Sequence, residues 1–439
     1  MKHTAYLRDF AKYTSLNVLG MIGLSCYILA DTFFVAKSLG ANGLAALNLA
    51  IPVYSFLHGS GLMIGMGGGT KYAIQRSQKD PDGANRTFTH TVLLAAGFAL
   101  FFMLAGGFLS GPIVTLFHAD ENVFEMTKTY IQVILLFAPA FLLNNVLLCF
   151  VRNDGAPQRA MTAMLVGSLS NVFLDYMFLF PLNMGIFGAV LATGLAPVIS
   201  MLLLSAHFLR KKNGFHLITE KLQGKLMVRI CSCGIPSLVT EVSSGVVMIV
   251  FNAIFLQLQG NVGVAAYGII ANLSLVVLAI YTGIAQGIQP LLSRNYGAGS
   301  SAGMSAILRY ALTTMLILSG VIYSIVFFGA APIAAAFNSE QNALLQRLAV
   351  EGLRLYLTAC PFVGFNIILS VYFTSTEQPR PAHVLSLLRG FVVILPAAFL
   401  LSAWFQTTGV WCAFPVTEFL VACIGAVCYR FSKRRPLAT

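Results

Sequence analysis

Residues 13 to 40 read YTSLNVLGMIGLSCYILADTFFVAKSLG. From Tyr13 to Ala30 the stretch carries no charged side chain, and Asp31 follows before the next charge at Lys37. An apolar run of roughly 20 residues is long enough for a helix that crosses about 30 Å of hydrocarbon. The stretch therefore predicts a transmembrane helix, and it raises the question of why a carboxylate lies within it.

The composition extends this prediction to the whole chain. The 439 residues are 57% hydrophobic and only 10% charged, whereas a soluble domain is usually about 25% charged. Each apolar run is expected to be a helix, because lipid offers the backbone no other hydrogen-bond partner. Twelve such runs centre near residues 25, 57, 99, 139, 170, 198, 246, 275, 318, 362, 393 and 418.

The distribution of lysine and arginine predicts the orientation. With twelve spans both termini lie on one side, and 23 of the 27 basic residues fall on that side. The basic residues opposite are Lys37, Lys128, Arg347 and Arg354. The excess marks the cytoplasmic side, so we expect a multi-pass protein of the plasma or inner membrane with both termini cytoplasmic. The net charge of +12 then reflects contact with the lipid bilayer, and no nucleic-acid partner is expected.

The cysteines do not indicate a metal site. Most of the eight lie in or at the ends of apolar spans, as small hydrophobic residues do. Cys231 and Cys233 form a C-x-C pair, but the further ligands that a metal would need are missing nearby.

The chain repeats itself at an offset of about 220 residues. GIFGA at 185–189 aligns with GVWCA at 409–413. Other aligned pairs are Gly40 with Gly260, Gly65 with Gly283, Gly69 with Gly287, Pro139 with Pro361, and Asn144 with Asn366. A duplicated six-span unit keeps its orientation, as in transporters whose two halves enclose a central cavity. We expect an all-α integral membrane protein with two pseudo-symmetric six-helix bundles, an N-lobe at 1–209 and a C-lobe at 230–439, joined by a cytoplasmic linker at 210–229.

Glycines concentrate in two of the spans. GLMIGMGGG at 61–69 and GIAQG at 283–287 both contain G-x-x-x-G, which lets helix backbones approach closely. Packing is a simpler explanation of these glycines than a direct gating role. The first stretch lacks the spacing of a phosphate-binding loop, so nucleotide binding is not expected.

Four carboxylates lie within spans: Asp31, Asp175, Glu241 and Glu418. A charged acid at the bilayer centre costs about 2.5 to 3.5 kcal/mol on insertion scales, so such groups usually face a protein interior or a water-filled cavity. Asp31 and Asp175 fall at similar heights in outward-running spans, and we expect them to face one another.

Each of these aspartates has a polar residue one helical turn before it. Tyr27 precedes Asp31 by four residues, and Asn171 precedes Asp175 by four, so each pair shares a helix face. Two neighbouring buried carboxyl groups can share a proton and titrate as a pair. The alternative is that Asp31 turns towards the membrane interface near Lys37, which would leave Asp175 unexplained.

The repeat shows that each lobe has its own acids. At the equivalent positions of the other half stand Phe251 for Asp31, Ala397 for Asp175, Met21 for Glu241 and Gly194 for Glu418. For Glu418 a structural pairing within the bundle and a functional role remain equally open. For Glu241 we favour an ion-binding or substrate-binding role, because it follows the helix-kinking Pro236 and precedes a pair of serines.

The chain resembles the multidrug and toxin compound extrusion (MATE) family over nearly its full length. The resemblance is carried by LADTFFVAKSLGANGLAALNLAIP, NVFLDYMFLFPLNMGIFGAVLAT, GVAAYGIIANL, GIAQGIQPLLSRNYGAG and GVWCAFPVTEF, and it points to the MepA-like and DinF-like bacterial branch. In DinF-like members a first-lobe network couples transport to an ion. Its residues match Tyr27, Asp31, Asn171, Asp175 and Thr193, and the seventh-span glutamate of other branches matches Glu241.

One departure bears on the coupling ion. Sodium-coupled NorM-like members carry an aspartate in the tenth span, whereas YLTACPFVGFNIILSVYF at 356–373 has no acid. A NorM-like sodium site in the second lobe is therefore in doubt, although sodium at Asp31 and Asp175 stays open beside protons. The resemblance implies a secondary active exporter of amphipathic organic cations, working by alternating access as a monomer, with no cofactor other than H⁺ or Na⁺.

Two other classes of function remain as alternatives. A flippase for lipid-linked oligosaccharide would be favoured by a basic residue deep in a span, and we expect none of the 27 there. A membrane enzyme would need a catalytic constellation. The sequence contains no H-E-x-x-H, and its seven histidines are scattered singly, mostly in or beside loops, so we do not expect an enzyme.

Overall fold

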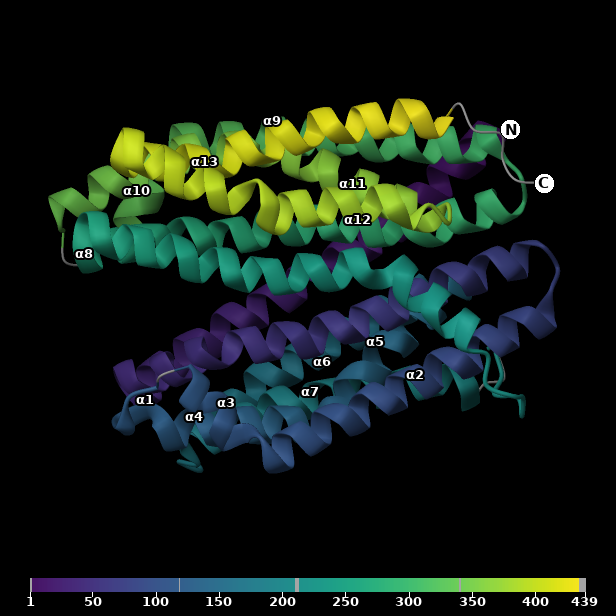
Figure 1. Ribbon diagram of the computed structural model, residues 1–439, viewed down its shortest axis with the longest axis horizontal. Coiled ribbons are helices and arrows are strands. Elements are labelled where there is room, and N and C mark those ends of the chain that lie inside the picture. The colour runs from purple at the N-terminus through teal and green to yellow at the C-terminus, as the bar shows by residue number, and fades with distance from the viewer. Residues whose placement is uncertain (1, 118, 210–212, 339–340, 434–439) are drawn as a thin grey trace. The chain divides into compact units, whose positions relative to one another are not determined.

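The computed structural model describes residues 2–117, 119–209, 213–338 and 341–433, and over these residues it is helical without any strand. In chain order (Figure 1) the helices are α1 (Lys2–Ser77), α2 (Pro81–Phe108), α3 (Ser110–Leu116), α4 (Glu121–Leu136), α5 (Ala138–Asn153), α6 (Pro157–Leu179), α7 (Gly185–Leu209), α8 (Gly224–Gly297), α9 (Ser301–Phe337), α10 (Ala343–Tyr356), the 3₁₀ turn η1 (Leu357–Ala359), α11 (Cys360–Ser375), α12 (Pro379–Leu387), the π-helical stretch η2 (Leu388–Val392) and α13 (Ile394–Lys433).

The described residues contain the twelve predicted spans. Eight helical segments are long and apolar enough to cross a membrane, or nine if α4 and α5, which are bent by 48°, form one broken span. Three of the segments are interrupted by a residue with non-helical backbone angles and therefore supply two spans each. These residues are Gly40 in α1, Gly260 in α8 and Gln406 in α13.

The breaks at Gly40 and Gly260 have nearly the same geometry. Their φ and ψ angles are 65° and −153° at Gly40, and 62° and −152° at Gly260. This region of backbone space is essentially restricted to glycine. The two residues are those that the internal repeat aligns, so the structure shows the same turn at the same place in both halves.

Contacts divide the chain into two compact units. The N-terminal unit consists of Leu19–Val242 and Ser293–Ala298, and the C-terminal unit of Met1–Val18, Ser243–Leu292 and Gly299–Thr439. The start of α1 thus belongs to the C-terminal unit and the start of α8 to the N-terminal unit. The lobe boundaries at 209 and 230 follow the sequence repeat and stay a prediction.

The glycine-rich stretch of α1 packs on two faces within the N-terminal unit. A Cβ atom at Gly65 would lie 2.8 Å from the carbonyl oxygen of Asn145 on α5. On the other face, a Cβ at Gly67 would collide with the carbonyl oxygen of Ile230 on α8. The predicted close approach of helices is therefore present, and it fixes the start of α8 against the second half of α1.

The C-terminal unit repeats this packing with the halves exchanged. A Cβ atom at Gly283, in the second half of α8, would lie 2.6 Å from Cα of Val18 in α1. One helical turn later, a Cβ at Gly287 would lie 2.8 Å from Cα of Thr14. In the N-terminal unit the start of α8 thus packs against the glycine-rich second half of α1. In the C-terminal unit the start of α1 packs against the glycine-rich second half of α8.

The described part of the predicted linker, from residue 213, is fixed to the N-terminal unit. Phe215 is fully buried, with ring centroids of Phe88 and Phe150 at 4.6 and 5.5 Å. Backbone N–H groups donate to side chains at four positions: Gly214 to Asp154, His216 to Asn85, Ile218 to Thr89 and Gln223 to His90. This segment is thus an integral part of the unit's packing.

Candidate functional site

The structure brings Asp31 and Asp175 together inside the N-terminal unit. Asp31 lies on α1 and is 7% exposed, and Asp175 lies on α6 and is fully buried. Their carboxyl groups lie close enough to interact with each other. Among the described residues, one oxygen of each carboxyl, Oδ1, has no hydrogen-bond partner. Two carboxyl groups this close in a buried site cannot readily both be ionised.

Asn171 connects this pair to α7. With its amide oriented as its neighbours require, its nitrogen donates to Oδ2 of Asp175 at 3.0 Å, and its oxygen accepts from the backbone N–H of Thr193 at 3.2 Å. Asn171 is fully buried and Thr193 is 4% exposed. The Thr193 hydroxyl donates to the carbonyl of Ala189 at 3.1 Å. Asp31, Asn171, Asp175 and Thr193 therefore form one cluster across three helices.

Three tyrosines surround the cluster. The hydroxyl of Tyr27 lies 3.2 Å from that of Tyr54, in the second half of α1. Tyr130 on α4 lies close to Thr193, and near enough to Asp31 and Asp175 to interact with their charges. Tyr27 and Tyr130 are buried, at 8% and 4% exposure. Tyr54 and Tyr130 thus add two phenol groups to the one that the sequence predicted at Tyr27.

Glu241 lies in the same unit, on α8. Its Oε2 atom is 3.7 Å from Nδ1 of His58, and its side chain is 35% exposed. The ring of His58 stacks on that of Tyr54, with centroids 5.7 Å apart and an interplanar angle of 9°. Because Tyr54 also contacts Tyr27, polar side chains continue from Glu241 to the aspartate cluster.

Glu418 has a different environment, in the C-terminal unit. It is fully buried, and its two carboxylate oxygens are both engaged. Arg389 Nε donates to Oε1 at 2.5 Å, and Asn366 Nδ2 donates to Oε2 at 2.7 Å. This paired geometry favours the structural reading of Glu418 that the sequence left open.

The expectation that no basic residue lies deep in a span is wrong for Arg389. It follows Pro379, the first residue of α12, by ten positions, which is about 15 Å at 1.5 Å per residue. The partner of Glu418 could not be named from the sequence, and the structure shows that Glu418 neutralises Arg389 from another helix. Because the pair carries no net charge, Arg389 does not provide the free cation that a pyrophosphate group would need.

The C-terminal unit is aromatic at the position that corresponds to Asp31. Phe251 is fully buried, and its ring centroid lies 5.5 Å from that of Tyr267 and 6.4 Å from that of Tyr356. Trp411, also fully buried, packs 4.3 Å from Phe255 in the same region. The repeat has therefore diverged into a carboxyl cluster in one half and an aromatic core in the other.

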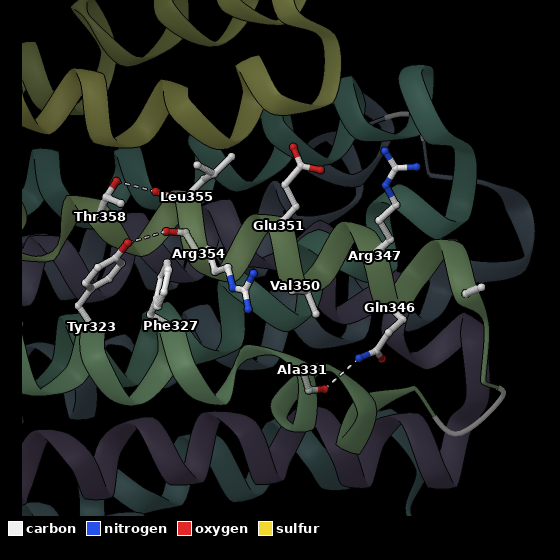
Figure 2. A pocket seen from close by; sticks show the side chains of 11 residues that line it. Tyr323, Phe327, Ala331, Gln346, Arg347, Val350, Glu351, Arg354, Leu355 and Thr358 are labelled. Carbon is white, nitrogen blue, oxygen red and sulfur yellow. Dashed lines mark hydrogen bonds between the residues drawn. The ribbon is translucent and has the colours of Figure 1, made fainter.

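A groove of about 800 Å³ lies between α9 and α10 in the C-terminal unit (Figure 2). The guanidinium of Arg354 stands 5.1 Å from the ring centroid of Phe327, and the hydroxyl of Tyr323 donates to the carbonyl of Arg354 at 3.3 Å. None of the site residues predicted from the sequence lines this groove.

Fold and comparisons together define the class of protein. The chain is an all-α, multi-pass membrane protein built from two repeats. The profile of the MatE family matches residues 18–177 and 236–400, and the chain belongs to this family of MATE transporters, as its motifs predicted.

Relatives of known name agree with this assignment. The chain is 27% identical over 403 residues to the multidrug export protein MepA of Staphylococcus saprophyticus, covering 90% of this chain and 87% of that protein. It is 25% identical over 398 residues to MepA of Staphylococcus aureus, with the same coverage of both chains.

Solved structures share the fold. An outward-facing multidrug resistance MATE family transporter of the MOP superfamily superposes with a TM-score of 0.90 at 22% identity, covering 97% of this chain and 95% of the other. A mutant of the Vibrio cholerae MATE transporter VcmN gives 0.91 at 18% identity, covering 99% of both chains.

Sequence reasoning missed Tyr54, His58 and Tyr130. A signal for two of them was present, because Tyr54 and His58 are four residues apart within a span, as are Tyr27 and Asp31. In the sequence, His58 is one of seven scattered histidines, and nothing else distinguishes it. Tyr130 gave no such signal, since its role depends on how α4 packs against α7.

Proposed function

We propose that this chain is a secondary active multidrug exporter that moves amphipathic organic cations out of the cell in exchange for protons. Its family and the names of its MepA relatives support export of drugs as the general activity. The observation that carries the coupling mechanism is the buried pair of Asp31 and Asp175.

The pair is suited to hold and release a proton. With one proton shared, the pair carries a single negative charge, and Asn171 stabilises Asp175 by hydrogen bonding. Losing that proton would leave two adjacent buried carboxylates that repel each other. A change in protonation therefore changes the balance of forces between α1 and α6, and an ion can shift a conformational equilibrium only through such a difference between states.

Protons suit the cluster better than sodium. A sodium ion would need several oxygen ligands in a fixed geometry. A proton neutralises one carboxyl without further ligands. The tenth span, at 356–373, also lacks the acid that the sodium-coupled branch carries there.

The carboxylate of Glu241, whose side chain is 35% exposed, supplies negative charge for a cationic drug, and the alternating-access cycle exposes it to each side in turn. Both termini face the cytoplasm of a plasma or inner membrane. We propose that the chain works as a monomer.

Uptake of a fluorescent organic cation, such as ethidium, into inverted vesicles tests this function. Asp31→Asn and Asp175→Asn keep side-chain shape but cannot exchange a proton, so each should abolish uptake while expression and membrane insertion stay near normal. Asp120→Asn, an exposed acid before α4, is the matched control and should transport normally. If both cluster variants transport normally and Glu241→Gln is inactive, the coupling site is Glu241 instead.

A further inference from the structure

Two arginines line the groove between α9 and α10 in the C-terminal unit (Figure 2). Arg347 and Arg354 are both exposed, and they lie seven residues apart on α10, so they share one face of that helix. Neither guanidinium forms an ion pair with a carboxylate of the described residues. A guanidinium stays charged under all ordinary conditions. The groove therefore offers two positive charges to a ligand.

The acid of the groove is held by another helix. Glu351 is the one carboxylate among the described lining residues, and its Oε1 accepts a hydrogen bond from the Thr408 hydroxyl of α13 at 2.6 Å. In Figure 2 its side chain points away from α9, whereas Arg354 extends towards Phe327 of α9. Two arginines and one glutamate leave the lining with a net charge of +1.

The groove lies near the edge of the hydrocarbon on the side opposite the termini. Arg309 of α9 is one of the basic residues predicted on the side of the termini. Phe327 follows it by eighteen residues, which is about 27 Å along the helix at 1.5 Å per residue. Because the hydrocarbon is about 30 Å thick, Phe327 and the neighbouring Arg354 lie near the headgroups of the opposite leaflet.

Apolar surface continues from the groove towards the middle of the membrane. Val350 and Leu355 contribute to its walls. Leu316 precedes Tyr323 by seven residues, so the two share a face of α9, and Leu316 is 61% exposed. Gly320, between them, is also exposed. A molecule held at the arginines by a charged group could therefore lay an apolar chain along α9.

The first half of the repeat lacks these charges. At the offset of 222 residues that aligns Pro139 with Pro361, Glu125 and Gln132 stand in place of the two arginines. The packing that the two halves share therefore does not require positive charge at these positions. The arginines are a feature of the second half alone.

We propose that this groove binds an anionic phospholipid, such as phosphatidylglycerol, from the leaflet opposite the termini. Arg347 and Arg354 donate hydrogen bonds to the oxygens of the headgroup phosphate, for which a guanidinium is well shaped. An acyl chain lies along the exposed face of α9. Phosphatidylcholine binds less tightly, because its own cation faces the positive lining. The inference does not rest on the proposed function, since it holds whichever ion drives transport.

Native mass spectrometry of the purified protein tests this binding. The protein in detergent is titrated with phosphatidylglycerol or phosphatidylcholine, and we expect one phosphatidylglycerol to bind in preference. Arg347→Gln and Arg354→Gln should each weaken its binding about fivefold, the usual contribution of one basic side chain beside anionic lipid. The matched control is Lys37→Gln, at an exposed basic residue whose amino group lies 5.9 Å from the ring centroid of Phe33, and it should bind normally.

Cross-linking locates the lipid without any substitution, and so carries the test if the glutamine variants do not fold. The unsubstituted protein is placed in vesicles that contain phosphatidylglycerol with a photoreactive group near the headgroup. Peptides from residues 316–358 should be labelled more strongly than with the corresponding phosphatidylcholine.

Four results would overturn the inference. They are unchanged affinity in both glutamine variants, equal binding of phosphatidylcholine, labelling confined to other helices, and displacement of phosphatidylglycerol by inorganic phosphate. The last would assign the arginines to a dissolved anion and leave the apolar part of the groove without a role in binding.

Discussion

The hydroxyl groups of Tyr27 and Tyr54 lie 3.2 Å apart and join the two halves of α1 within the N-terminal unit. On one side of this contact, Asp31 is one helical turn from Tyr27. On the other, His58 stacks on Tyr54 and faces Glu241. The contact therefore links the predicted coupling cluster to the predicted substrate carboxylate through side chains of one unit.

This contact predicts non-additive effects of removing the hydroxyls. Tyr27→Phe and Tyr54→Phe should each lower stability by about 1 to 3 kcal/mol, because each leaves the other hydroxyl, buried or half-buried, without its partner. The double variant should be no less stable than the worse single variant, since neither hydroxyl then remains unpaired. Thermal unfolding in detergent measures this. Simple addition of the two effects would show that the hydroxyls do not depend on each other.

Glycine substitution tests the close helix packing. Gly67→Ala places a methyl group where the carbonyl of Ile230 stands, so we expect a large loss of folded protein and of transport. The control is Gly97→Ala on α2, where a Cβ would meet nothing within 4 Å. It should be neutral or stabilise by about 0.5 to 1 kcal/mol, the usual difference between glycine and alanine within a helix. Normal yield of Gly67→Ala, judged by size-exclusion chromatography, would contradict the packing.

Phe215→Ala tests whether the segment after residue 212 is part of the N-terminal unit's packing. Removing this fully buried ring should destabilise by about 3 to 5 kcal/mol, as for other buried phenylalanines. Phe108→Ala, at a ring that is 78% exposed, is the control and should change stability little. Equal unfolding temperatures for the two variants would mean that the segment does not contribute to the packing of the unit.

The buried ion pair in the C-terminal unit gives a test of Glu418. Arg389→Ala should destabilise by about 3 to 5 kcal/mol, because it leaves the Glu418 carboxylate buried without its cation. Arg389→Met combined with Glu418→Gln removes both charges and keeps the Asn366 hydrogen bond, so it should recover most of the stability and keep proton-driven uptake. A stable but inactive double variant would assign Glu418 a functional role.

Much of the architecture could be predicted from sequence because membrane helices leave strong local signals. Apolar length located the twelve spans, and the repeat located Gly40 and Gly260, whose backbone angles then proved nearly equal. Helix periodicity placed Tyr27 with Asp31 and Asn171 with Asp175. Because Asp31 and Asp175 lie at similar heights in their spans, we expected them to face one another, and in the structure they lie close together.

What the sequence did not predict depends on packing between helices. The pairing of Arg389 with Glu418 joins residues 29 positions apart on different helices, and Tyr130 reaches Thr193 only through the contact of α4 with α7. The place of His58 beside Glu241 depends on a glycine contact between α1 and α8. Such pairs depend on which helices pack together in three dimensions, and periodicity along one helix does not reveal that packing.

The central claim is that protons drive transport through Asp31 and Asp175, and one measurement tests it most directly. A pH gradient, acidic inside, is imposed across inverted vesicles in sodium-free buffer, and uptake of ethidium is followed by fluorescence. We predict that the pH gradient alone drives uptake and that Asp31→Asn abolishes it. Absence of uptake until sodium is added, with uptake then following the sodium gradient after the pH gradient is collapsed, would contradict proton coupling.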